Sequence, residues 1–169
     1  MDKNPEDPQV VVGVDGSGPS ILALRLAATL APALGARVHA VACWDYPKMY
    51  EEYLLPDPKA FQEAARSHLS AAIEEAFGAE PPPEFTSEVV RGQASTRLVE
   101  AGATAQLLVV GRRGHGGLRG LHLGSVSNAC VAHAASPVLV VHDDGKPQVH
   151  HRWRDRYREN RPLEPYDLL

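Results

Sequence analysis

The stretch "LLVVGRRGHGGLRGLHLGS", residues 107–125, joins a short apolar run to a loop rich in glycine and arginine. The run "LLVV" is apolar at every position rather than at alternate ones, which is typical of a strand buried on both faces of a parallel sheet. The loop holds six of the fourteen glycines and three arginines, with no acidic residue. A loop so rich in glycine and arginine, directly after a buried strand, predicts a binding site for an anion.

Four further runs resemble strands, and helical segments separate them. The strand-like runs are residues 10–14, 37–43, 85–92 and 137–142, and the helical segments are residues 17–35, 57–78, 94–103 and 125–135. Ser17 or Gly18 is a suitable N-cap for the first helix, and Pro32 should kink or end it early. This alternation predicts an α/β fold with a single doubly wound, Rossmann-like, five-stranded parallel sheet and helices on both faces. In such sheets ligands bind beyond the carboxyl ends of the strands.

Length and composition indicate one domain with tails. The chain has 169 residues, 44% of them hydrophobic, and a formal net charge of -4. We expect an N-terminal tail over residues 1–9, a single α/β domain over residues 10–142, and a Pro/Arg-rich tail or arm over residues 143–169. The acidic balance argues against nucleic acid and membrane partners. Because the first residues resemble no signal peptide, we expect a soluble, cytoplasmic protein with two buried thiols, Cys43 and Cys130.

The glycine loop has the features of a phosphate site. Gly111 and Gly114 leave the strand, where missing side chains let the main chain fold over a ligand. Gly124 and Ser125 open the next helix, whose N-terminal N–H groups and dipole attract anions. The alternative is a flexible glycine-rich surface loop. The loop lacks the GxxxxGK[ST] of Walker-type sites, and "GVDGSG" after the first strand spaces its glycines differently from a dinucleotide fingerprint.

The spacing G-x2-G-x9-G-[ST], filled by Gly111, Gly114, Gly124 and Ser125, resembles the universal stress protein family, specifically its ATP-binding branch. The likeness extends over residues 10–142 and includes "VVGVDGS", "ALGARVHAVACW" and the final "PVLVV". It implies strand order 3-2-1-4-5 and an adenine nucleotide, ATP, ADP or AMP, bound with Mg²⁺ at the switch point. It also implies a set of cofactor-binding residues: Val14, Asp15, Val41, Ala42, Gly111, Arg112, Gly114, His115, Gly124, Ser125, Val126 and Ser127.

The resemblance gives these residues separate roles. Asp15 lies near the ribose or a metal-bound water, and the backbone at Val41 and Ala42 meets the adenine edge. A buried carboxylate beside phosphates needs a cation or a sugar hydroxyl as its partner, which fits Mg²⁺. Asp15 has an alternative role as an N-cap or Asx-turn for the first helix, and both roles can coexist. His115 is either a phosphate donor or an exposed loop residue, and no residue is predicted to ligate a metal directly.

Three function classes follow. The first is an ATP-binding stress-response regulatory protein, with slow ATP hydrolysis or self-phosphorylation at Ser125 as its only conceivable chemistry. The second is a nucleotide transferase or hydrolase, but its SGGxDS-type or HxGH-type loop is missing. The third is a scaffold whose loop binds another anion. "WDYPKMYEEY", residues 44–53, could form an aromatic lid at the adenine end or pack against the second helix.

We expect the last strand to form the main contact with a partner. The family resemblance implies a homodimer through the run that starts at Pro137 and ends at His142, and a bare apolar edge strand invites such pairing. The tail "HHRWRDRYRENR", residues 150–161, could be disordered, pack as an arm on the partner, or contact an anion or nucleic acid. A regulatory role also implies a protein partner, which the sequence does not name.

Overall fold

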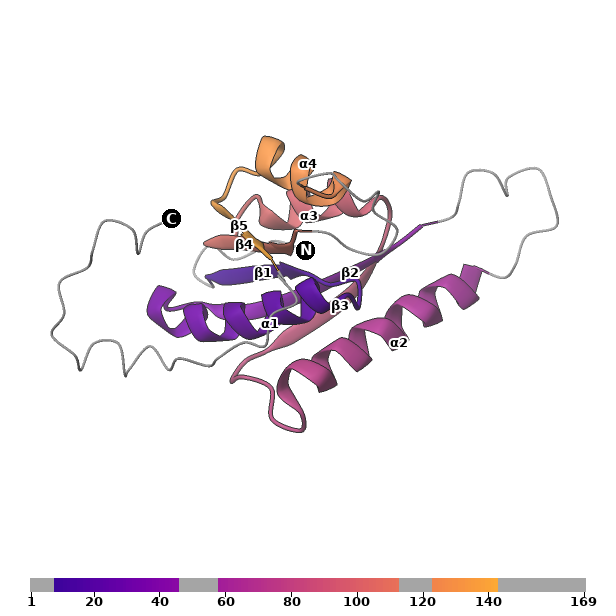
Figure 1. The fold of residues 1–169 in the computed structure, drawn as a ribbon, viewed down its shortest axis with the longest axis horizontal. Coiled ribbons are helices and arrows are strands. Elements are labelled where there is room, and N and C mark those ends of the chain that lie inside the picture. Colours follow the sequence, from indigo (N-terminus) through magenta and orange to yellow (C-terminus); the bar gives the residue numbers. More distant parts are fainter. Residues whose placement is uncertain (1–7, 46–57, 113–122, 143–169) are drawn as a thin grey trace, which may run out of the picture.

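Strands and helices alternate along the chain in the computed structural model, which describes residues 8–45, 58–112 and 123–142 (Figure 1). The C-terminal tail, the aromatic stretch after Asp45 and the middle of the glycine loop lie outside these residues. The strands are β1 (Gln9–Gly13), β2 (Arg37–Trp44), β3 (Thr86–Arg91), β4 (Leu107–Gly111) and β5 (Val138–Val141). The helices are α1 (Gly18–Leu30), α2 (Pro58–Phe77), α3 (Ala94–Gly102) and α4 (Ser125–His133).

The strands form one parallel sheet in the order β3-β2-β1-β4-β5. β1 lies in its centre and pairs with β2 from Gln9 opposite Arg37 to Gly13 opposite Val41. On its other side β1 pairs with β4, with Val10 opposite Leu107. The predicted fold class and strand order are confirmed. Because all the strands are parallel, their carboxyl ends meet at one edge of the sheet.

Each face of the sheet has its own hydrophobic core, because neighbouring residues of a strand point to opposite faces. Val10 and Val12 pack with α1 and α2, including Leu24 and Leu69. Val11 packs on the opposite face with Leu98 of α3 and Cys130 of α4. Figure 1 shows the two helix pairs on opposite sides of the sheet. The central strands β1 and β4 are largely buried on both faces, as their uninterrupted apolar runs predict, whereas the edge strand β3 is mostly exposed and β5 is half-buried.

The signals at the ends of α1 act as expected. The side chain of Ser17 caps its N-terminus by accepting a hydrogen bond from the backbone N–H of Ser20. α1 ends at Leu30, and a 3₁₀ turn (Ala31–Leu34) containing Pro32 follows it. This turn closes at Gly35, whose φ of 57° is a left-handed conformation that glycine adopts without strain. Pro32 therefore ends the α-helix, as predicted.

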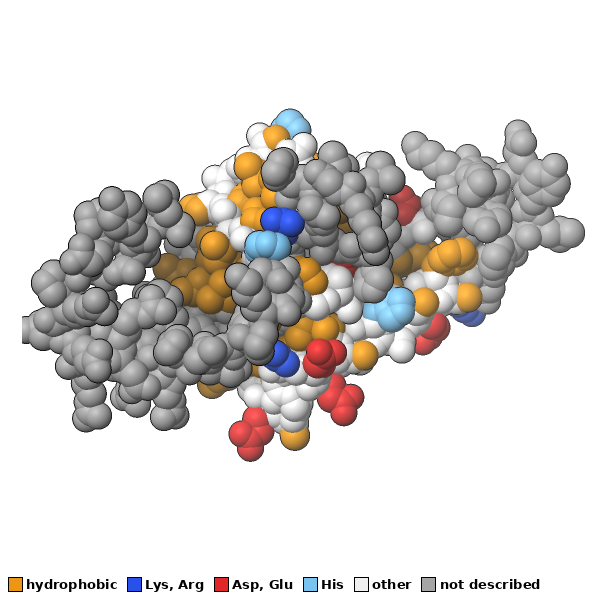
Figure 2. Space-filling view, viewed as in Figure 1, with side chains coloured by type: hydrophobic (Ala, Val, Ile, Leu, Met, Phe, Trp, Pro, Cys, Tyr) orange, Lys and Arg blue, Asp and Glu red, His pale blue; other side chains and the backbone are white. Residues whose placement is uncertain are grey.

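Charged side chains are unevenly spread over the surface. In Figure 2 most of the visible acidic side chains lie along the lower side of the molecule, where α2 ends in Figure 1. Glu74 and Glu75 belong to this last turn of α2. Within the described ranges, no helix is both long and apolar enough to cross a membrane. These acidic side chains disfavour anion binding at this end of α2.

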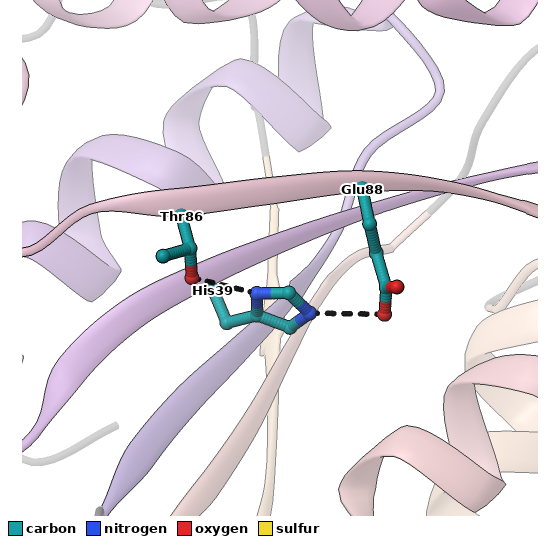
Figure 3. Close-up of polar contacts among 3 residues, drawn as sticks. All are labelled: His39, Thr86 and Glu88. Carbon is teal, nitrogen blue, oxygen red and sulfur yellow. Dashed lines mark hydrogen bonds and ion pairs between the residues drawn. The ribbon is translucent and has the colours of Figure 1, made fainter. Parts of the chain in front are cut away.

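A histidine ties the edge strand β3 to its neighbour (Figure 3). The two ring nitrogens of His39 on β2 contact Thr86 Oγ1 at 2.8 Å and Glu88 Oε1 at 3.0 Å, both on β3. The tautomer with its proton on Nε2 satisfies every group, because Thr86 then donates to Nδ1 and Nε2–H donates to the carboxylate. These contacts hold β3 in register at the amino ends of the strands, away from the candidate site.

Candidate functional site

A cavity of about 230 Å³ opens at the carboxyl ends of β1 and β2, against the first half of α2. Three residues predicted for the nucleotide site, Val14, Asp15 and Ala42, line it. Its remaining lining residues are Cys43, Trp44, Asp45, Phe61, Ala64, Ala65 and His68. The strand ends contribute one wall and α2 the other. The cavity thus lies where ligands bind in open α/β sheets.

Asp15 turns the chain from β1 into α1. Its Oδ1 accepts hydrogen bonds from the backbone N–H of Ser17 at 3.0 Å and from the Ser17 hydroxyl at 2.6 Å. The predicted Asx-turn is therefore confirmed, while the N-cap itself is Ser17. The expectation of a buried carboxylate is wrong, because Asp15 is exposed at the end of the strand. The carboxylate is fixed by Ser17 at the mouth of the cavity, where water screens its charge.

Val41 and Ala42 face opposite sides of the sheet. Val41 packs into the core beneath α3 and α4, and its carbonyl accepts a hydrogen bond from the backbone N–H of Val14 at 2.9 Å. Ala42 belongs to the other core and lines the cavity. The side chain of Ala42 therefore borders the cavity, and that of Val41 does not.

The two ends of the glycine loop are joined by hydrogen bonds. The Ser127 hydroxyl donates to the carbonyl of Gly111 at 2.6 Å and contacts that of Arg112 at 3.2 Å. The Gly124 N–H donates to the same Arg112 carbonyl at 2.8 Å. Gly114 and His115 lie outside the described residues. Because its proton is used on these carbonyls, the Ser127 hydroxyl holds the start of α4 against the end of β4.

The N-terminus of α4 presents backbone donors beside the carboxyl end of β4. Gly124 is its N-cap and offers no side chain to the first turn, which contains Ser125, Val126 and Ser127. The first intrahelical bond runs from the Asn128 N–H to the Gly124 carbonyl at 2.9 Å. The first N–H groups of a helix have no partner within it, and the helix dipole makes this end positive. The arrangement suits an anion.

Gly111 is required by packing between elements. A Cβ at this position would lie 2.9 Å from Pro19 Cβ, 3.0 Å from the Pro19 carbonyl carbon and 3.1 Å from the Ser20 nitrogen. The missing side chain therefore lets the end of β4 approach the first turn of α1. We expected Gly111 to let the main chain fold over a ligand. The structure shows a separate reason for glycine at this position, the close contact with α1, and the role beside a ligand stays a prediction.

Seven residues that line the cavity were not among the predicted site residues: Cys43, Trp44, Asp45, Phe61, Ala64, Ala65 and His68. Phe61 and His68 are two turns apart on α2, so they lie on one face of that helix. Their seven-residue spacing was a signal in the sequence, but it does not show which face of α2 turns toward the sheet. Trp44 was placed near the adenine end, and the structure puts it in the cavity wall.

Of the two cysteines, Cys130 is buried and Cys43 is half-buried. Burial raises the pKa of Cys43 from 9.0 to about 11, with a smaller opposing effect from Arg97. Burial also raises the pKa of Cys130. Both thiols therefore stay protonated near neutral pH and are weak nucleophiles. Among the described residues, no three His, Cys, Asp or Glu side chains gather in a group that could hold a metal ion.

The sequence comparison decides the family. Residues 8–142 match the model of the universal stress protein family. The chain belongs to the universal stress protein family. The universal stress protein Rv2005c of Mycobacterium tuberculosis is 37% identical over 139 residues, which are 81% of this chain and 46% of that protein. Rv1996 of the same species is 32% identical over 159 residues, covering 86% and 50%. The chain thus spans about half the length of the curated relatives that it matches.

Solved structures of universal stress proteins share the fold. UspA from Lactobacillus plantarum is similar with a TM-score of 0.64 at 21% identity, over 79% of this chain and 97% of that chain. A universal stress protein in complex with cAMP has a TM-score of 0.51 at 30% identity, over 80% and 96%. A relative with this level of similarity therefore binds an adenine nucleotide.

Proposed function

We propose that this universal stress protein binds an adenine nucleotide at the carboxyl ends of β1, β2 and β4 and acts as a regulatory protein in the cytoplasm. The observation that carries the proposal is the cavity that Val14, Asp15 and Ala42 line beside α2. The cAMP complex of a relative that is 30% identical adds support. In this proposal ATP, ADP and AMP are the candidate ligands, and binding rather than turnover is the function.

The ligand's orientation follows from the chemistry along the strand ends. The cavity between β2 and α2 has mainly apolar and aromatic walls, including Ala42, Phe61 and Ala65, and suits the base. Asp15 follows β1, so its carboxylate can accept hydrogen bonds from ribose hydroxyls. The N-terminus of α4 follows β4, the next strand of the sheet, and suits the phosphates. The order base, ribose, phosphate thus follows the strand order β2, β1, β4.

The Asp15 carboxylate also fits Mg²⁺. Protein-bound Mg²⁺ usually keeps several waters and uses one or two carboxylates together with the phosphates of a substrate. Asp15 is exposed beside the cavity, which agrees with a contact to the ion through one of its waters. The ion would offset the repulsion between the negative charge of Asp15 and that of the phosphates.

Calorimetric titration of nucleotide-stripped protein with AMP, ADP, ATP and MgATP tests this proposal. We expect saturable binding that inorganic phosphate does not prevent, because the base contributes part of the affinity. Asp15→Asn is the informative variant, since the amide keeps an acceptor for Ser17 but removes the charge. We expect it to weaken binding and to reduce the difference between ATP and MgATP.

Thr29→Ala is the matched control, because Thr29 lies in the last turn of α1, where its hydroxyl donates to the Arg25 carbonyl at 3.0 Å. It should bind as the wild type does. No binding of any nucleotide by the folded wild type would refute the proposed function. Binding abolished by inorganic phosphate would favour a general anion site instead.

We further propose that two copies of the chain pair through β5. β5 is an edge strand, and all four of its residues are half-buried in the single chain. The carbonyls of Pro137 and Val141 accept hydrogen bonds from β4, so the N–H of Val140 points to the outer edge. Val140→Pro should therefore convert a dimer into a monomer in sedimentation velocity, whereas Val140→Thr should not. A monomeric wild type would refute this pairing.

A further inference from the structure

Trp44 is the last residue of β2, and contacts from β3 and the turn after it hold both its backbone and its ring. The Gly92 N–H donates to the Trp44 carbonyl at 2.8 Å. The Arg91 guanidinium lies over the indole ring, 5.6 Å from its centroid. A cation over an indole face is an attractive contact that favours one ring position. The ring is therefore held at the edge of the sheet by contacts within the protein itself.

The turn after β3 depends on a glycine and on contacts with α3, and it positions Arg91 beside Trp44. Gly92 has φ of 134°, a conformation that other residues rarely adopt. A Cβ there would lie 2.6 Å from Arg97 Nε, which itself donates to the Arg91 carbonyl at 3.0 Å. Arg97 in turn pairs with Glu100 at 2.8 Å. The turn that carries Arg91 toward Trp44 is thus fixed by contacts with α3.

Trp44 and Phe61 bring two aromatic side chains to one cavity from two different elements, β2 and α2. Ala42, Ala64 and Ala65 are small apolar neighbours, and Asp15, Asp45 and His68 are the polar ones. The volume of about 230 Å³ is below the range of about 300–1,000 Å³ usual for pockets that enclose a whole drug-sized ligand. The cavity is therefore suited to the ring system of a ligand, with the rest extending outside.

We propose that Trp44, held by Arg91, is the wall against which the purine base packs, so that the base rather than the phosphate chain determines which ligands bind. This inference rests on the proposed function and deepens it. Aromatic faces attract bases of every kind, and a purine offers the larger ring surface. AMP should then retain most of the affinity of ATP, and ribose 5-phosphate should retain little.

Trp44 provides its own spectroscopic readout. The chain has two tryptophans, Trp44 and Trp153, so Trp153→Phe leaves Trp44 as the only one. We expect AMP and GMP each to change the fluorescence emission of Trp44. For each nucleotide the dissociation constant from fluorescence should equal the one from calorimetry. Ribose 5-phosphate and inorganic phosphate should leave the emission unchanged.

Substitutions at the cavity and away from it distinguish a loss of packing against the base from a general effect on the structure. Trp44→Ala should weaken AMP binding by about 5- to 150-fold, which corresponds to the cost of about 1–3 kcal/mol that is typical when an aromatic residue stacked on a base is replaced by alanine. Trp44→Phe keeps an aromatic face and should lose much less. Arg91→Gln should give an intermediate loss, because the ring is less firmly held. Phe77→Leu, at the opposite end of α2, changes an aromatic residue away from the cavity and should bind AMP normally.

The outcomes distinguish this inference from the proposed function. If the wild type binds AMP but Trp44→Ala binds it equally well and the Trp44 emission is unchanged, the base packs elsewhere and the inference is wrong. Equal affinity for CMP and AMP would also overturn the role of the purine ring. If the folded wild type binds no nucleotide by calorimetry, the proposed function itself fails.

Discussion

Ser127→Ala removes one oxygen that joins the two ends of the glycine loop. The Ser127 side chain is almost fully buried, with 3% of its surface exposed. Its hydroxyl donates to the Gly111 carbonyl at 2.6 Å and contacts the Arg112 carbonyl at 3.2 Å. The shorter bond is the one at risk, because the Arg112 carbonyl keeps its bond from the Gly124 N–H at 2.8 Å. Alanine fits the site without a clash, so the substitution tests the hydrogen bond alone.

The expected loss follows from leaving the half-buried Gly111 carbonyl without this donor. An unsatisfied buried group costs about 1–3 kcal/mol, and the lower part of this range applies to a group that is only partly buried. Serine to alanine inside a helix returns up to about 0.5 kcal/mol through helix propensity. We therefore expect Ser127→Ala to lower the free energy of unfolding by about 1–2 kcal/mol. In a domain of this size that corresponds to a fall in Tm of roughly 3–8 °C.

Ser125→Ala is the matched control, since it makes the same chemical change two residues earlier on α4. Ser125 is exposed, so its substitution should alter stability by less than about 0.5 kcal/mol. Urea unfolding and thermal melts of the two variants give the difference directly, with helix propensity largely cancelled. Equal stability of the two variants would refute the role of Ser127 in closing the loop.

Two further predictions concern packing and ionisation. Gly111→Ala forces a Cβ against the Pro19 backbone at 3.0 Å and should lower the free energy of unfolding by about 1–3 kcal/mol, measured by urea unfolding; unchanged stability would show that α1 moves away freely. Cys43 has a pKa raised by burial to about 11, so its alkylation at pH 8 should be about a hundredfold slower than that of a thiol with pKa 9.0. The folded state keeps this proton up to pH 11 while the unfolded state loses it near pH 9. Stability should therefore fall between pH 9 and 11, less so in Cys43→Ser, and an equally steep fall in both proteins would contradict the assignment.

The architecture was predictable because most strands are largely apolar and the connections are helical, although β3, which contains Ser87 and Glu88, gave a weaker signal. Pro32 and Gly35 marked the end of α1, and Gly78 marked the end of α2, where its φ is 63°. Hydrophobic patterns do not specify which strands are neighbours. The order 3-2-1-4-5 came from the resemblance of the glycine spacing to a known family.

The site was predictable in part. The family resemblance supplied Asp15 and Ala42 as site residues, and the structure places both at the cavity, at the carboxyl ends of β1 and β2. The contacts of Gly111 with Pro19 and of Ser127 with Gly111 join residues far apart in the sequence, and no local pattern encodes them. For the same reason Phe61 was missed, since the rotation of α2 against the sheet depends on packing in three dimensions.

Backbone amide chemical shifts of isotope-labelled protein, followed during addition of AMP, test the central claim most directly. The account predicts shifts at Asp15, Ala42 and Trp44 around the cavity and at Ser125 to Ser127 at the start of α4. Amides around His39 and Thr86, toward the opposite ends of the strands, should stay in place. Shifts confined to that opposite end, or no shift at saturating AMP, would contradict a nucleotide site at the carboxyl ends of the strands.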